Sequence, residues 1–236
     1  MHAPAIALSD LKFRWTPNGP PVLDIPSLTI APSQRVFLRG PSGSGKTTLL
    51  NLIGGVMRPQ HGTISLGGTD ITALSGPQRD RYRANHIGFI FQQFNLVPYL
   101  GLIQNVTLPC RFSKQRQTHG TQNGALNAEA RRLLTHMQLD VDMLADRSVS
   151  TLSVGQQQRV AAARALIGAP ELIIADEPTS SLDTDARTAF LGLLGEEITR
   201  SNATLVFVSH DASLADGFDQ ILELSDLNHA APAQAA

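Results

Sequence analysis

A glycine-rich stretch between an apolar run and a helical pattern contains the residues needed to hold a chain of phosphates. It follows Val36-Phe37-Leu38 and reads Gly40-Pro41-Ser42-Gly43-Ser44-Gly45-Lys46-Thr47-Thr48. Glycines let the backbone curl with its N–H groups pointing inward at a helix N-terminus, which suits a bound anion. Lys46 would reach the β- and γ-phosphates, and Thr47 would offer its hydroxyl to Mg²⁺. The stretch predicts phosphate binding, without separating an ATPase from a kinase or a GTPase.

Two carboxylates, Asp176 and Glu177, directly follow the apolar run Leu172-Ile173-Ile174-Ala175. Ligands of α/β sheets bind at the carboxyl ends of the strands, so we expect this pair beside the phosphate loop. Asp176 is suited to hold Mg²⁺, and Glu177 is suited to orient or deprotonate an attacking water. The competing interpretation is a helix-capping acidic pair. The metal site is preferred because two acids after a buried strand are costly without a cation.

Two more polar residues end apolar runs in the same way. His210 follows Thr204–Val208 and Ser209, and it could hydrogen-bond the γ-phosphate and the water. Gln92 follows the run 87–91, and its amide could contact Mg²⁺ and the water while linking the sheet to the next segment. Taken alone, the first would more often be a structural histidine, and the second an ordinary turn residue. The neighbouring motifs favour the phosphate interpretation.

A second anion-binding pattern lies far along the chain from the first. Ser153 and Gly155 stand at the start of a helical pattern in Leu152-Ser153-Val154-Gly155-Gln156-Gln157-Gln158-Arg159. One chain needs only one cradle for a γ-phosphate. The second pattern therefore suggests a contact to the nucleotide of another subunit.

The elements that position these residues begin with strands and then alternate. Strands are predicted at 6–15 with one phase slip, and at 23–30, 35–39 and 63–66. Helices are predicted from Lys46 to the stop at Gly54-Gly55 and, exposed to solvent, at 76–85. Beyond Val149, helices at 155–166, 185–198 and 211–216 alternate with strands at 171–175, 204–208 and 220–224. This alternation favours a mostly parallel sheet covered on both faces.

Residues 93–150 interrupt the alternation as a helical insert, with helices at 102–108 and 125–137. Between them, the polar stretch 113–124 is expected to be a mobile surface loop. The predicted fold is α/β: a P-loop NTPase core of about 1–92 and 151–229, with an antiparallel β sub-domain at the N-terminus and an inserted helical sub-domain. One domain would span 1–229, and the tail 230–236 would be frayed.

Composition limits the remaining classes of protein. The chain has 236 residues, 42% of them hydrophobic and 17% charged, and a net charge of −1, which argues against a dedicated nucleic-acid binder. Its one cysteine, Cys110, excludes an internal disulfide, fits a reducing compartment, and is expected to be a small buried apolar residue. The sequence shows neither an apolar run of 18 residues nor a secretion signal, so we expect any membrane role to come through a partner.

At this point the chain resembles the ATP-binding subunits of ABC transporters over nearly its whole length. The lipoprotein-releasing and macrolide-export branch is the most similar. Five motifs carry the resemblance, in order: 40–48, Gly88-Phe-Ile-Phe-Gln-Gln-Phe-Asn-Leu96, 152–159, Ala175-Asp-Glu-Pro-Thr-Ser-Ser-Leu-Asp183 and Val208-Ser-His-Asp211. It implies ATP and Mg²⁺ as ligands, with all of residues 40–48 around the nucleotide.

The resemblance also implies roles for single residues. Gln92 would be the Q-loop residue, Asp183 the D-loop aspartate and His210 the switch histidine. Trp15 would stack on adenine, although a core tryptophan on the first strand is an open alternative. In a head-to-tail homodimer, contacts to the nucleotide held by the opposite subunit would come from Ser153, Gly155 and Gln156.

The sequence departs from the family pattern at several positions. Val154 replaces a glycine, and because valine disfavours positive φ and carries bulk, the close approach of that backbone is in question. Ser181 replaces a common alanine, and Gln104 stands where glutamate is frequent. The stretch 113–124 is longer than expected. We still expect hydrolysis.

The function implied is ATP hydrolysis that drives a separate membrane permease, in an exporter or a lipid-handling system on the cytoplasmic face of the membrane. A rival function is ATP-dependent signalling to a membrane or cell-wall partner without transport. A soluble ATPase acting on DNA or the ribosome is disfavoured by the near-zero net charge and the absence of a long coiled insertion. A nucleotide kinase would leave 152–159 unexplained.

Overall fold

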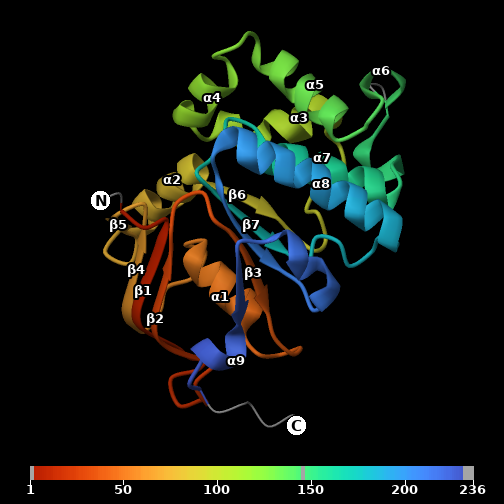
Figure 1. The fold of residues 1–236 in the computed structure, drawn as a ribbon. Coiled ribbons are helices and arrows are strands. Elements are labelled where there is room, and N and C mark those ends of the chain that lie inside the picture. The colour runs from red at the N-terminus through yellow and green to blue at the C-terminus, as the bar shows by residue number, and fades with distance from the viewer. Residues whose placement is uncertain (1–2, 145–146, 231–236) are drawn as a thin grey trace. The chain divides into compact units, whose positions relative to one another are not determined.

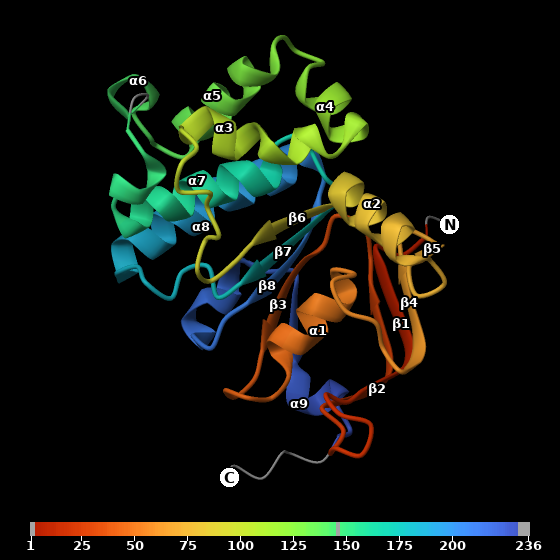
Figure 2. The ribbon, with the colours of Figure 1, turned by 180° about the vertical axis from the view of Figure 1, so that it is seen from behind.

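A computed structural model describes residues 3–144 and 147–230, and Figures 1 and 2 show it from opposite sides. The chain divides into two compact units. Unit 1 is built from the residues up to Arg83 and from Thr204 onward, and unit 2 from Ala84–Ala203. Except for Ala230, the predicted tail 230–236 lies outside the described residues.

Unit 1 contains an antiparallel sheet in the order β2-β1-β4-β5. Its strands are β1 (Ile6–Phe13), β2 (Leu23–Ile30), β4 (His61–Leu66) and the short β5 (Thr69–Asp70). The phase slip in the sequence pattern is a bulge, because the register of β1 against β4 shifts between Ser9 and Lys12. Within it, Asp10 has a left-handed φ of 49°. The extra residue brings Leu11 and Phe13 back to the buried face.

Unit 1 also contains a group of three parallel strands. Strand β3 (Arg35–Arg39) pairs in parallel with β8 (Thr204–Val208) on one side and with β9 (Gln220–Glu223) on the other. Both views show α1 (Lys46–Ile53) lying between this group and the antiparallel sheet. The rings of Phe37 and Phe207 stack with centroids 5.9 Å apart in the core. The remaining elements are α2 (Gly76–His86), which crosses into unit 2, η3 (Ala212–Gly217) and α9 (Leu224–Leu227).

Unit 2 places helices around two parallel strands, β6 (Ile87–Ile90) and β7 (Leu172–Asp176). Gly88 lets α7 (Val154–Leu166) approach closely, since a Cβ there would lie 2.3 Å from the Ala165 carbonyl oxygen. The smaller helices of unit 2 are α3 (Leu102–Thr107), η1 (Leu108–Arg111), α4 (Lys114–Gly120), α5 (Leu126–His136), α6 (Val141–Leu144) and η2 (Val149–Thr151). Figure 2 shows α7 beside α8 (Thr184–Ser201), with α3, α4 and α5 on the other side of α7.

The prediction of a surface loop at 113–124 is wrong, because residues 114–120 form helix α4. The Ser113 hydroxyl caps it by accepting the Arg116 N–H at 3.0 Å. Arg116 is only 2% exposed, and its guanidinium donates to main-chain carbonyl oxygens, among them that of Ile167 at 2.6 Å and that of Ala165 at 2.8 Å. Burial lowers the pKa of Arg116 to about 10. The polar stretch thus contains a buried side chain, Arg116, whose hydrogen bonds connect α4 to the end of α7.

The structure bears on two features that were considered from composition: the single cysteine and membrane-spanning helices. Cys110 is 3% exposed, as predicted for a small buried residue, and burial raises the pKa of its thiol. Over residues 3–144 and 147–230, the structure contains no helix whose length and apolar character would suit a membrane crossing.

Candidate functional site

The phosphate loop in unit 1 connects β3 to α1. Gly43 and Gly45 have positive φ values of 76° and 102°, and Gly45 is the N-cap of α1 with no side-chain cap. Lys46, the first helical residue, is 7% exposed, and its Nζ donates to the carbonyl oxygens of Gly40 at 2.8 Å and Pro41 at 2.9 Å. The amino group is therefore held within the loop rather than extended into solvent.

The chemistry of this loop fits a phosphate chain. The N–H groups of the first turn of α1 receive no side-chain cap, so they remain available to an anion. The Ser44 hydroxyl is buried and has no hydrogen-bond partner among the described residues. A Cβ on Gly45 would lie 3.0 Å from Leu23 Cδ2, so only glycine fits there without a shift. Thr47 is exposed and Thr48 is buried.

His210 lies at the same edge of the unit 1 sheet as the loop. Leu38 of β3 pairs with Val208 of β8, so Gly40 and His210 each stand two residues beyond paired positions of parallel strands. His210 is exposed, whereas Ser209 before it is buried. The predicted contact of His210 with the γ-phosphate stays a prediction.

Trp15 lies two residues beyond β1, also in unit 1. Its side chain is 64% exposed and meets the Phe13 ring at 88°, with centroids 5.2 Å apart. The alternative that Trp15 is a core residue is therefore wrong, because the chain leaves the sheet before reaching it. An exposed indole supported from one side suits stacking against a planar ring.

In unit 2, the carboxyl ends of β6 and β7 bring together three of the predicted residues. Ile90 pairs with Ala175, so Gln92 and Glu177 each stand two residues beyond paired positions, and Asp176 ends β7. Glu177 has a left-handed φ of 44°. For a residue other than glycine this conformation costs about 1 kcal/mol or more, and such strain concentrates at functional sites.

The Ser153 segment begins α7 with reciprocal hydrogen bonds. The Ser153 hydroxyl accepts the Gln156 N–H at 3.2 Å, and the Gln156 side-chain oxygen accepts the Ser153 N–H at 2.9 Å. Val154 is the first helical residue and is 49% exposed, so it needs no positive φ. Of the two grounds for questioning the close approach of this backbone, the positive φ does not apply, and the bulk of valine stays as a question. Gly155 follows it within the first turn of α7.

Asp183 has a structural contact in the same unit. It is the N-cap of α8, and its carboxylate accepts the Ala186 N–H at 2.8 Å. Ser181, two residues earlier, is exposed.

Sequence reasoning missed the residues that support the segment after Gln92. Asn105 has no exposed surface, and its amide donates to the carbonyl oxygens of Val97, Leu100 and Gly101. Arg164 of α7 donates to the carbonyl oxygens of Phe94 and Asn95. The sequence does contain a signal for Arg164, since it is a charged residue within the apolar pattern of a predicted helix.

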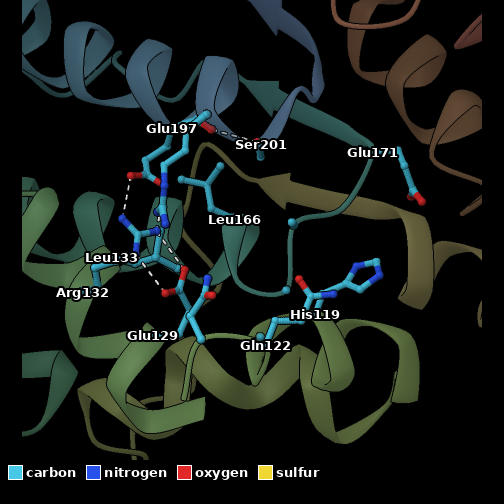
Figure 3. Close-up of a pocket in the computed structure, with 14 residues that line it drawn as sticks. His119, Gln122, Glu129, Arg132, Leu133, Leu166, Glu171, Glu197 and Ser201 are labelled. Atoms are coloured by element: carbon cyan, nitrogen blue, oxygen red, sulfur yellow. Dashed lines mark hydrogen bonds and ion pairs between the residues drawn. The ribbon is translucent and has the colours of Figure 1, made fainter. Parts of the chain in front are cut away.

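A separate cavity of about 410 Å³ in unit 2 contains none of the predicted site residues. Figure 3 shows it between α5 and the ends of α7 and α8. Arg132 crosses it and pairs with Glu129 and Glu197, each at 2.8 Å. Burial alone would raise the pKa of Glu197, but the Arg132 hydrogen bond and charge outweigh it and lower that pKa. The charges of Arg132, Glu129 and Glu197 therefore compensate one another.

Comparisons with known proteins show the family of the chain. A family model described as "ABC transporter" matches residues 23–180. The chain is 40% identical over 225 residues to the lipoprotein-releasing system ATP-binding protein LolD of Anaeromyxobacter dehalogenans, covering 94% of this chain and 91% of that protein. It is 40% identical over 223 residues to the macrolide export ATP-binding/permease protein MacB of Syntrophobacter fumaroxidans, covering 94% of this chain but 30% of that protein.

A solved structure has the same fold. It is the dimeric ATP-binding cassette MJ0796 in a post-hydrolysis state bound to ADP and Pi, with a TM-score of 0.81 and 32% identity, covering 92% of this chain and 93% of that one. The predicted fold class and family resemblance are thus confirmed. The chain belongs to the ABC transporter family, as an ATP-binding cassette ATPase.

Proposed function

We propose that this ATPase binds ATP with Mg²⁺ in its phosphate loop and uses hydrolysis to drive a separate membrane permease. The observation that carries the proposal is the loop itself, with a glycine-capped α1 and the buried Lys46 amino group. The LolD relative, matched over 91% of its length, supports a permease on another chain, since its name assigns it only the ATP-binding part of a lipoprotein-releasing system. The protein would then sit on the cytoplasmic face of the membrane through that partner.

The residues of one chain have separate tasks in this scheme. Lys46 and the α1 N–H groups hold the phosphates and stabilise the charge that develops on them. Thr47, Asp176 and Gln92 offer the oxygen ligands that Mg²⁺ prefers, and the ion when bound neutralises phosphate charge. Trp15 stacks on the adenine. The nucleotide-facing residues of the loop are Gly40, Pro41, Ser42, Gly43, Ser44, Gly45 and Thr48.

Glu177 and His210 act on the attacking water. The Glu177 carboxylate accepts a hydrogen bond from the water, orients it toward the γ-phosphate and takes up its proton. The strained backbone of Glu177 supports this role, because it fixes the side chain at the end of β7. His210 donates a hydrogen bond to the γ-phosphate.

A second copy of the chain completes the site. Its Ser153 and Gly155 would contact the γ-phosphate from α7, and Asp183 would lie nearby at the start of α8. The Gln156 side-chain oxygen holds the Ser153 N–H, so Gln156 would orient Ser153 toward the nucleotide. ATP contacts both copies, and this differential affinity favours the closed dimer until hydrolysis removes it.

An exporter or a lipid-handling system is the expected setting, because the branch resemblance and the names of the relatives point that way. Signalling to a membrane or cell-wall partner without transport is the alternative. Substrate flux in vesicles that contain the permease separates the two functions. Nucleic acid is not an expected partner, given a net charge of −1.

The test compares Glu177→Gln with wild type and with Glu196→Gln, an exposed carboxylate of α8 as the matched control. We expect Glu177→Gln to lower ATP turnover by about 100-fold or more, as loss of a general base does, and to form a dimer with ATP and Mg²⁺ in light-scattering measurements. Glu196→Gln should behave as wild type. Wild-type turnover in Glu177→Gln would remove the assigned role of Glu177, and a wild type without turnover would overturn the proposal.

A further inference from the structure

Arg164 is a buried cation whose hydrogen bonds go to main chain next to Gln92. It lies in the last turns of α7 and is 9% exposed, and burial lowers its pKa. Its Nη2 donates to the Phe94 carbonyl oxygen at 2.5 Å, and its Nη1 donates to the Asn95 carbonyl oxygen at 2.6 Å. Such short charge-assisted bonds are stronger than bonds between neutral groups.

The two carbonyls belong to an unfavourable piece of backbone. Phe94 and Asn95 are consecutive left-handed residues, with φ values of 57° and 50°. Only glycine, and less often asparagine or aspartate, visits this conformation readily, so the phenylalanine in particular needs external support. Local hydrogen bonds close the turn, from Phe94 N–H to the Phe91 oxygen at 3.0 Å and from Asn95 N–H to the Gln93 oxygen at 2.6 Å.

The other end of the segment is held independently. Asn105 is fully buried, accepts the Val97 N–H at 2.8 Å, and donates to the carbonyl oxygens of Val97 and Leu100 at 3.1 and 3.0 Å. Gln92 therefore lies on a short stretch between the end of β6 and the Arg164 contact. That contact lies at the turn of the stretch.

We propose that Arg164 is a positioning residue for Gln92: its two hydrogen bonds hold the left-handed turn at Phe94 and Asn95, and so fix the Gln92 amide relative to the last turn of α7. Arg116 holds the same turn of α7 from α4, through the carbonyl oxygens of Ala165 and Ile167. The function of Gln92 in this inference rests on the proposed function. The structural link between Arg164 and the turn is independent of the proposed function.

The experiment replaces the guanidinium with side chains of similar length. Arg164→Met removes both donors, and Arg164→Lys keeps the charge without the planar fork. Arg131→Met is the control, because Arg131 of α5 is exposed, lies outside every motif of the site, and pairs only with the exposed Asp142 at 2.8 Å among the contacts of the described residues. For Arg164→Met we expect kcat for ATP to fall about tenfold or more, as for a misplaced positioning group. The Kd for ATP should change less than about twofold, since Lys46 and its loop are untouched.

A rescue variant separates positioning from general stability. Asn95→Gly adopts the left-handed conformation at no steric cost, so Arg164→Met combined with Asn95→Gly should recover at least about threefold of the lost kcat. Hydrogen exchange at the Phe94 and Asn95 amides gives a second readout, which does not require turnover. It should accelerate in Arg164→Met, slow again in the double variant, and stay unchanged in Arg131→Met.

The outcomes discriminate between the two proposals. Wild-type kcat and exchange in Arg164→Met would overturn the inference, and so would a loss that Asn95→Gly fails to restore. If Arg164→Met does not fold, Arg164→Lys is measured in the same way, with an intermediate loss expected. A wild type without turnover would overturn the proposed function, while the exchange data would still decide whether Arg164 holds the turn.

Discussion

Helices α1 and α7 both begin at segments predicted to meet phosphate, but their N-termini are built differently. Helix α1 has glycine as its N-cap and no side-chain cap, so its first-turn N–H groups lack a partner from that position. Helix α7 has Ser153 as its N-cap, and the hydrogen bonds between Ser153 and Gln156 satisfy two N–H groups of the chain itself. The first N-terminus leaves N–H groups without a side-chain cap, whereas the second is capped by side chains of its own chain.

The first residues of the two helices also differ in how far they are exposed to solvent. Lys46 of α1 is 7% exposed and donates into its own loop, whereas Val154 of α7 is 49% exposed. The α1 terminus is thus a cradle formed within one chain. The α7 terminus presents a surface, as expected of a segment that meets the nucleotide of a second copy.

Removing the Lys46 amino group tests the cradle most directly. Lys46→Ala leaves the phosphates without their nearest cation, so we expect ATP turnover to fall by about 100-fold or more, in the range seen when a preorganised charge-stabilising group is lost. Steady-state hydrolysis and an ATP titration measure the effect. Lys12→Ala is the control, because Lys12 makes only an exposed ion pair with Asp24 at 3.2 Å. Unchanged turnover in Lys46→Ala would contradict the assignment of the α1 terminus as the phosphate cradle, and so its contrast with α7.

The α7 terminus should respond in a different pattern. Ser153→Ala removes the cap and a hydroxyl that would face the γ-phosphate in a dimer, so turnover should fall about 10- to 100-fold, the value of one hydrogen bond to a charged group. Stability should fall by about 1 kcal/mol from the lost cap. ATP binding to the single chain, measured at low protein concentration, should not change. A loss of that binding would mean that Ser153 contacts the nucleotide held by its own chain.

Steric demand at the α1 terminus gives a smaller effect. Gly45→Ala forces a Cβ to within 3.0 Å of Leu23 Cδ2 at a φ of 102°, so ATP affinity should fall about tenfold, from roughly 1–2 kcal/mol of strain. Gly43→Ala carries a similar φ of 76° but has no atom within 4 Å of the added carbon. Isothermal titration of the two variants separates clash from conformation. Equal losses would show that only the positive φ matters.

Much of the fold was predictable because its signals are local. The strands at 23–30, 35–39 and 204–208 have the predicted bounds, since their apolar runs end at Pro, Gly or polar residues. The family was identified from short motifs, and the comparisons confirm it. The roles of the site residues and the division into a core and an insert at 93–150 stay predictions.

The errors came from contacts between distant parts of the chain. Arg116 is buried because carbonyl oxygens at the end of α7, about 50 residues later, accept its hydrogen bonds. A polar stretch gives no sign of such partners, so α4 was predicted as a loop. Arg164 was missed for the same reason, since its partners Phe94 and Asn95 lie about 70 residues earlier.

The smallest effect is expected at Val154, and it tests whether the α7 surface needs glycine. Because Val154 is already helical and exposed, Val154→Gly should change ATP turnover by less than about threefold, while glycine in a helix costs stability of about 0.5–1 kcal/mol. Turnover and thermal unfolding measure the two effects, with Val56→Gly, outside α1 and 50% exposed, as a control for losing an exposed valine. A tenfold gain in turnover would mean that valine bulk holds the two copies apart. The surface at α7 would then be a restraint on hydrolysis as well as a contact.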